Sequence, residues 1–110
     1  MNGGEYQVLV IGAAGLDMKV WPLSPALEPD RSNPGRIRCE WGGVARNIAE
    51  NLARLGTDVQ FITAVGDDEW GERLLEDLKR LQINTDEVLV VPEQPTSSYV
   101  RLHHLDGEFW

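Results

Sequence analysis

A pair of glycines followed by a polar side chain is the feature of this sequence best suited to binding a ligand. Residues 41–47 read Trp-Gly-Gly-Val-Ala-Arg-Asn and open a segment with helical periodicity. Glycines without a Cβ let a ligand approach the backbone, and the N–H groups at the start of a helix point toward it. Asn47 adds both a donor and an acceptor, so Gly42, Gly43 and Asn47 together suit vicinal hydroxyls. A structural interpretation stays open, in which the glycines form a turn and Asn47 satisfies local backbone groups.

Asp17 is the second candidate for contacts with hydroxyl groups. It lies just beyond the end of the first apolar run, and ligands of open α/β sheets collect at the carboxyl ends of the strands. A carboxylate there can accept hydrogen bonds from two hydroxyls together. The alternative is an exposed aspartate in a turn. Because the end of a first strand and the start of a helix that enters the next strand can open onto one crevice, we expect Asp17 and the 42–47 segment to act together.

The elements that must position these residues alternate between strands and helices. Apolar runs predict buried strands at residues 6–11, 59–65 and 88–91, the first of them buried on both faces. Between them, helical patterns predict helices at 44–55 and at about 69–81, the second beginning at an aspartate N-cap. Strand, helix, strand, helix, strand implies right-handed crossovers, so the fold class is α/β with a doubly wound sheet.

The first of these helices has a predicted buried face. Its larger apolar residues recur at helical spacing, its charged residues lie elsewhere, and Gly56 provides the C-terminal stop. The predicted core positions are Val44, Ile48, Leu52 and Leu55; the predicted outward positions are Arg46, Glu50 and Arg54.

Two further segments leave the main sheet. Residues 17–41 contain four prolines and no helical periodicity, which predicts short extended pieces joined by turns. Residues 97–105 are extended, and Asp106-Gly107 is a hairpin-turn signal followed by only three residues, Glu108-Phe109-Trp110. A hairpin that stops so soon after its turn suggests a truncated chain.

Composition excludes several classes of function. The chain has 110 residues, a formal net charge of −8 and a pI near 4.6, whereas a nucleic-acid partner would require clustered Lys and Arg. No apolar stretch approaches the ~20 residues of a membrane helix, and no charged leader precedes one. The single cysteine, Cys39, excludes an internal disulfide. We therefore expect a cytoplasmic protein with a reduced thiol.

Three weaker signals have simpler explanations. Residues 12–15, Gly-Ala-Ala-Gly, lack the third glycine of a dinucleotide fingerprint. His103 and His104 point to opposite faces of a strand, so they are not expected to share a metal. The acidic run at 67–69 fits a helix start without a magnesium ion. The sequence predicts no metal site.

Residues 42–56, Gly-Gly-Val-Ala-Arg-Asn-Ile-Ala-Glu-Asn-Leu-Ala-Arg-Leu-Gly, followed by Ala-Val-Gly-Asp-Asp-Glu-Trp-Gly at 64–71, resemble the N-terminal signature of the ribokinase-like (PfkB) carbohydrate kinases. The resemblance runs from the 12–17 turn to the strand that carries residues 96–99. Residues 32–37 and 95–99 make the chain most similar to the pseudouridine kinases within that family. Gly15 and Val44 stand where ribokinases usually carry Asn and Lys, which favours a nucleoside over ribose.

The resemblance implies a function and a site. Members of the family transfer the γ-phosphoryl group of ATP, with Mg²⁺, to a hydroxymethyl group of a sugar or nucleoside. It assigns contacts with sugar hydroxyls to Asp17, Gly42, Gly43 and Asn47 and makes residues 17–41 and 96–110 a small β-sheet lid. Asn33 and Ser98 would be further lid contacts. Trp21, Trp41 or Tyr99 would border the base, with simple packing as the alternative.

One part of the family pattern is missing from this sequence. The family's Gly-Ala-Gly-Asp motif, which supplies the anion hole and the catalytic base, has no counterpart among the 110 residues. We therefore assign no catalytic residue, expect no ATP or Mg²⁺ to bind this chain, and predict that it has no kinase activity alone.

Two alternative functions stay open. A kinase for ribose, a fructose phosphate or a ketodeoxy sugar would share the fold and differ only in pocket contacts. A non-catalytic binding or dimerisation module would instead use the lid strands to pair with a second copy, because an exposed strand edge is a template for such pairing.

Overall fold

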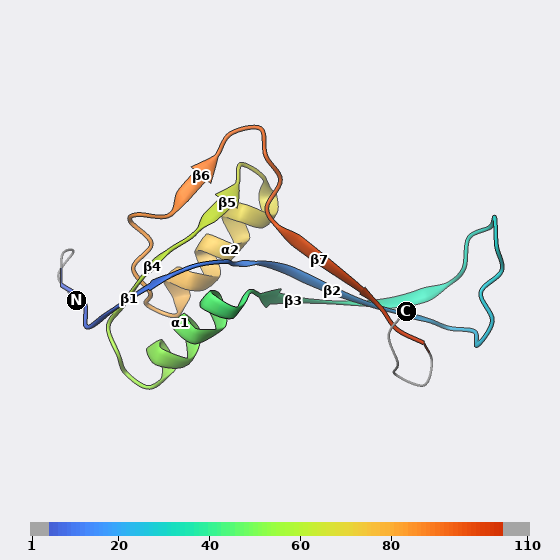
Figure 1. Ribbon diagram of the computed structural model, residues 1–110, viewed down its shortest axis with the longest axis horizontal. Helices are drawn as coiled ribbons and strands as arrows, with labels where there is room; N and C mark the ends of the chain where they lie inside the picture. Colours follow the sequence, from blue (N-terminus) through green and yellow to red (C-terminus); the bar gives the residue numbers. More distant parts are fainter. Residues whose placement is uncertain (1–4, 105–110) are drawn as a thin grey trace. The chain divides into compact units, whose positions relative to one another are not determined.

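The computed structural model describes residues 5–104, and these form two compact units (Figure 1). The first unit comprises residues 5–16 and 41–97, and the second comprises residues 17–40 and 98–104. None of the helices in the described residues is long and apolar enough to cross a membrane.

The strands of the first unit form two parallel pairs. β1 (Val8–Ile11) pairs with β4 (Val59–Ile62), and β5 (Ala64–Gly66) pairs with β6 (Leu89–Val91). The single strand predicted over 59–65 is therefore wrong in detail, because the chain breaks its ladder at Thr63 and changes partner. The carbonyl of Thr63 accepts a hydrogen bond from the N–H of Leu89 (2.9 Å), which starts the second pair.

Two helices pack against one apolar cluster of this unit. α1 (Val44–Arg54) and α2 (Glu69–Arg80) contribute to the cluster with β1 and β4 (Figure 1). Its most deeply buried side chains are Phe61, Leu74, Leu78 and Val59. The predicted alternation of strands and helices is confirmed, and the fold class is α/β.

The buried face of α1 differs from the predicted one. Val44 and Leu55 are 78% and 81% exposed, whereas Ala49 is fully buried and Ala45 and Ala53 pack beside it. Residues spaced by four share one helix face, and here the smallest residues occupy the face toward the strands. Small side chains let the helix backbone approach the strands closely, and this requirement outweighs the greater hydrophobicity of Val44, Ile48 and Leu55.

β1 also departs from its predicted burial on both faces. Val10 is 8% exposed, but its neighbours Leu9 and Ile11 are 50% and 68% exposed. Side chains alternate across a strand, and both described helices contribute to the cluster on the side of Val10. In the described residues, therefore, no helix covers the second face of β1, which a doubly wound sheet would cover.

The predicted N-cap of α2 is confirmed. The carboxylate of Asp68 accepts a hydrogen bond from the N–H of Gly71 (2.8 Å), and it also accepts from the backbone N–H (2.8 Å) and the hydroxyl (2.6 Å) of Thr96. Thr96 Oγ1 in turn accepts from the N–H of Gly66 (3.0 Å). One carboxylate thus holds the start of α2 to the segment that precedes β7.

The second unit is a sheet of long strands. β2 (Gly15–Pro22) and β3 (Gly35–Gly42) are eight residues each, longer than the short pieces predicted, and β7 (Ser98–Leu102) lies on the other side of β2 in the order β3-β2-β7. The extended character predicted for both segments is confirmed. The hairpin turn predicted at Asp106-Gly107 lies outside the described residues.

Candidate functional site

The start of α1 is built around a glycine that no other residue can replace without strain. Gly42 ends β3, and Gly43 is the N-cap of α1 with a φ of 100°. A Cβ on Gly43 would collide with the carbonyl of Ala13, and the same carbonyl accepts a hydrogen bond from the N–H of Arg46 (3.2 Å). Gly43 therefore has a structural reason to be glycine. No side chain caps α1, and the carbonyl of Ala13 takes up the N–H of Arg46 alone, so the N–H groups of Val44 and Ala45 stay available to a ligand.

Asn47 lies on the first turn of α1 with its side chain exposed and oriented by its neighbour. A guanidinium nitrogen of Arg46 (Nη1) donates a hydrogen bond to Oδ1 of Asn47 (3.2 Å). Because a guanidinium only donates, it can face only the oxygen of the amide. The NH₂ group of Asn47 is consequently turned away from Arg46, and it offers a donor to any hydroxyl oxygen near the start of the helix.

Arg46, predicted to lie on the outer face of α1, is instead 6% exposed. Its Nη2 pairs with Oδ2 of Asp77 on α2 (2.7 Å) and with Oε1 of Glu50 (2.8 Å). The pKa of Glu50 is lowered, chiefly by a hydrogen bond from Arg54 and, against the effect of burial, by the charge of Arg46. Arg46 therefore joins the two helices and contacts a candidate binding residue.

Asp17 belongs to the second unit, where it is half-buried on β2. It lines a small cavity of about 100 Å³ together with Met18, Lys19, Tyr99 and Arg101. The residues around it include two cations and a phenol, so the carboxylate lies in a polar setting. Gly42, Gly43 and Asn47, in contrast, all belong to the first unit and form one continuous backbone segment.

The two lid candidates have different environments. The side chain of Asn33 accepts a hydrogen bond from the N–H of Glu28 (2.8 Å) and donates to the carbonyls of Glu28 (2.9 Å) and Arg31 (2.8 Å). These contacts close the 28–33 loop and give Asn33 a structural role there. Ser98 is exposed at the first position of β7.

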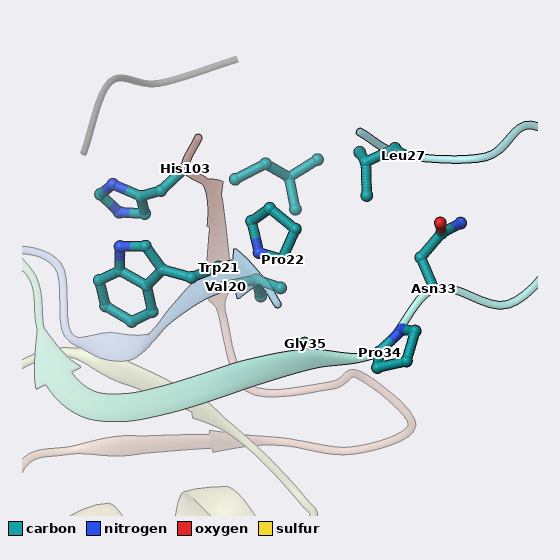
Figure 2. A pocket seen from close by; sticks show the side chains of 9 residues that line it. Val20, Trp21, Pro22, Leu27, Asn33, Pro34, Gly35 and His103 are labelled. Atoms are coloured by element: carbon teal, nitrogen blue, oxygen red, sulfur yellow. The ribbon is translucent and has the colours of Figure 1, made fainter. Parts of the chain in front are cut away.

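The aromatic candidates are held by packing. Trp21 stacks on His103 with ring centroids 4.7 Å apart, and both border a cavity of about 210 Å³ in the second unit (Figure 2). Trp41 meets Trp70 edge to face at 6.1 Å and packs against the core of the first unit. Tyr99 is 61% exposed, with the guanidinium of Arg101 5.9 Å from its ring centre. Trp41 is thus engaged in packing within the first unit, whereas Trp21 borders a cavity and Tyr99 is exposed.

Metal-ligating residues are dispersed. Over residues 5–104 the structure contains no group of three or more His, Cys, Asp or Glu side chains that could hold a metal ion.

Arg46 and the Asp68–Thr96 pair are the residues that the sequence pattern did not reveal. The partners of each pair lie far apart in the chain, 31 residues for Arg46 and Asp77 and 28 for Thr96 and Asp68. One pattern in the sequence could have indicated the burial of Arg46. Alanines at 45, 49 and 53 define a second possible buried face of the helix, and Arg46 lies beside that face.

Comparison with known proteins assigns the chain to a family. Residues 6–108 match the pfkB family carbohydrate kinase model, which is almost the whole chain. The chain belongs to the pfkB family. The resemblance seen in residues 42–71 is thereby confirmed.

Two curated relatives are a nucleoside kinase and a sugar kinase. The chain is 41% identical over 108 residues to a pseudouridine kinase of Escherichia coli (strain K12), covering 98% of this chain and 34% of the relative. It is 44% identical over 105 residues to the uncharacterized sugar kinase YeiI of the same strain, covering 94% and 28%. The chain thus spans about a third of the length of the curated relatives it matches.

The fold agrees with that of solved pfkB-type kinases. A ribokinase from Cryptococcus neoformans var. grubii serotype A, solved in complex with ADP, superposes with a TM-score of 0.77 at 27% identity, covering 93% of this chain and 32% of the ribokinase. That ribokinase binds an adenine nucleotide.

Proposed function

We propose that this chain supplies the substrate-binding part of an ATP-dependent kinase that phosphorylates a hydroxymethyl group, converting pseudouridine to pseudouridine 5′-phosphate. The observation that carries the proposal is the start of α1, where no side chain caps the helix and the oxygen of the Asn47 side chain is engaged by Arg46, which leaves its NH₂ group to donate. Donors fixed at one point in this way suit hydroxyl oxygens, and the identity to a pseudouridine kinase favours the nucleoside.

Each proposed contact has a separate chemical role. Asp17 accepts hydrogen bonds from sugar hydroxyls, while the NH₂ of Asn47 donates one. Gly42 and Gly43 allow the sugar to approach the backbone, because neither has a Cβ. Each contact would restrict the orientation of the hydroxymethyl group, and positioning of this kind is the main contribution a protein makes to phosphoryl transfer.

The two predicted lid segments, which include the second unit, have a proposed role in covering the substrate. Residues 17–41 and 96–110 would cover the bound substrate and exclude water, since water would otherwise compete with the substrate hydroxyl for the phosphoryl group. Asn33 and Ser98 are their proposed additional contacts. We further propose that a segment carrying the ATP site completes a doubly wound sheet. We also propose that the kinase acts in the cytoplasm, where ATP is available.

The first test is a substrate screen of a full-length kinase that contains this chain. ADP release is measured with ATP and magnesium for pseudouridine, uridine, ribose and fructose 6-phosphate. A preference for pseudouridine supports the proposal. A preference for a plain sugar would be consistent with the family but would reject a nucleoside as the substrate. It would favour a sugar kinase activity, as in the name of the second relative.

The site is tested by two substitutions in the same protein. Asp17→Ala and Asn47→Ala should each weaken substrate use by about 1–3 kcal/mol, the cost of leaving a buried partner unpaired. Arg54→Gln on the exposed side of α1 is the matched control, because Glu50 is the ion-pair partner of Arg54 within residues 5–104. Unchanged kinetics in both alanine variants would refute the proposed site.

A second candidate function is pairing of two copies through the second unit. Among the described residues, β3 and β7 are the outer strands of the three-stranded sheet, and Ile37, Val100 and Leu102 are 65%, 55% and 51% exposed on them. Sedimentation of the chain should then show a dimer that Val100→Pro disrupts, because proline removes a ladder donor. A strict monomer at high concentration would remove this candidate.

A further inference from the structure

We infer that Arg46 is a positioning residue of the substrate site, which sets the orientation of the Asn47 amide so that its NH₂ group faces the ligand. This inference rests on the proposed function, because it gives Asn47 a ligand to donate to. It assigns a role to a residue that makes no proposed contact with substrate itself.

The burial of Arg46 carries the first step. Its guanidinium is almost fully enclosed, with a side chain 7% exposed, and it is held by Asp77 on α2 and Glu50 on α1. A buried charge with two carboxylate partners at 2.7 and 2.8 Å has little freedom to move. Arg46 is therefore a fixed point on a helix whose neighbouring residue is exposed.

The planar fork of arginine carries the second step. One terminal nitrogen, Nη2, is used by the two carboxylates, and the other, Nη1, is left to donate to Oδ1 of Asn47 at 3.2 Å. An exposed asparagine without such a partner rotates between two amide orientations that exchange donor and acceptor. The fixed donor selects the one in which the oxygen faces Arg46 and the NH₂ group does not.

The consequence is a preference for acceptor atoms in the ligand. With its oxygen engaged, Asn47 recognises a ligand oxygen through its NH₂ group rather than a ligand donor through its carbonyl. The amide of Asn47 is oriented before the ligand binds, so the entropy cost of ordering that side chain does not reduce the affinity.

A double-mutant cycle between Arg46→Lys and Asn47→Ala tests the inference in the full-length kinase. Lysine keeps the charge but has one terminal nitrogen in place of the two of arginine. It therefore cannot contact the carboxylates and Oδ1 of Asn47 through separate nitrogens. Arg46→Lys should raise KM for the nucleoside about three- to tenfold, the loss expected for one hydrogen bond, and leave KM for ATP unchanged. In the double variant the two losses should not add, because both act through the same amide.

The possible outcomes are distinct. If Asn47→Ala leaves KM unchanged, the proposed site itself is wrong and the inference falls with it. If Asn47→Ala raises KM while the Arg46→Lys effect is absent, or adds fully in the double variant, the site stands and the positioning role is refuted. Arg54→Gln, which loses a cation from the same Glu50 without touching Asn47, should leave KM for the nucleoside unchanged; an increase like that of Arg46→Lys would show a general effect of helix charge and overturn the inference.

A second variant covers the case in which Arg46→Lys does not fold. Asp77→Asn keeps the size of the side chain and every atom of Arg46, but it removes one of the two carboxylate charges that hold Nη2. It should also raise KM for the nucleoside, by less than Arg46→Lys, and again without additivity to Asn47→Ala. Full additivity in this pair would equally refute the positioning role.

Discussion

The two units of the chain are stabilised in different ways. In the first unit, Phe61, Leu74 and Leu78 are fully enclosed between strands and helices. In the second unit, His103 is the one side chain among the described residues below a tenth exposed, and its indole partner belongs to the same sheet. A layered unit is stabilised mainly by apolar burial, whereas a single sheet depends on its backbone ladder and on cross-strand pairs. A given substitution should therefore have unequal effects in the two units.

Removal of an aromatic ring should separate the units most clearly. Phe61→Ala deletes a side chain with no exposed surface, so we expect a loss of about 3–5 kcal/mol in the free energy of unfolding. Tyr99→Ala in the second unit removes a ring that is 61% exposed and should cost less than about 1 kcal/mol. Chemical denaturation of the chain measures both. Equal losses would contradict the proposed difference between the units.

Removing one ion-paired carboxylate from each unit should give a smaller contrast. Asp77→Ala leaves the buried Arg46 with only one carboxylate and should cost about 1.5–3 kcal/mol. Glu40→Ala breaks the pairs with Lys19 (3.2 Å) and Arg38 (3.4 Å), which are exposed, and should cost about 0–1 kcal/mol. The difference should persist in high salt, because salt screens only the exposed pairs effectively.

The contact between α2 and the segment before β7 can be weakened without changing its shape. Thr96→Val keeps the volume but removes the hydroxyl that donates to Asp68 and accepts from the N–H of Gly66. The expected loss is about 1–3 kcal/mol in the free energy of unfolding, because a buried N–H is left unpaired. Thr96→Ser, which keeps the hydroxyl, is the control and should retain most of the stability.

The pH dependence of the same contact is the finest test. Hydrogen bonds from the hydroxyl and backbone N–H of Thr96, and then from Gly71, hold the pKa of Asp68 below its ordinary value of 3.8. A lowered folded pKa means that this stabilisation is complete above about pH 3.8 and is lost as the pH falls through the folded value. In an NMR titration of the Asp68 carboxyl carbon, the midpoint should rise toward 3.8 in Thr96→Val. An unchanged midpoint would show that Thr96 is not the cause.

The local sequence pattern predicted the positions of the helices and strands better than it predicted which of their faces are buried. The periodicity of residues 44–55 located α1 within one residue of its end, but two faces compete on that helix. Hydrophobicity favoured Val44, Ile48 and Leu55, while the close approach of helix to strand selected the alanines. That choice depends on the partner surface, so it is not contained in the helix sequence.

The candidate site was predictable in its residues but not in its geometry. Absent Cβ atoms and a helix start single out Gly43 and Asn47 from the sequence alone. The carbonyl of Ala13 that makes Gly43 necessary, and the guanidinium that turns Asn47, both depend on tertiary contacts. The link between Arg46 and Asp77 spans two helices, and no local pattern encodes it.

The parallel pairing of β1 with β4 has a consequence for how the chain is made. Val8 cannot find its partner Val59 until about 50 further residues have left the ribosome, which takes several seconds at roughly 5–20 residues per second. During that interval the apolar run Val8–Ile11 has no strand to pair with, and parallel pairs of such separation form slowly even afterwards. During synthesis β1 is therefore open to non-native contacts, and codons that slow synthesis between residues 12 and 58 should lower the soluble yield.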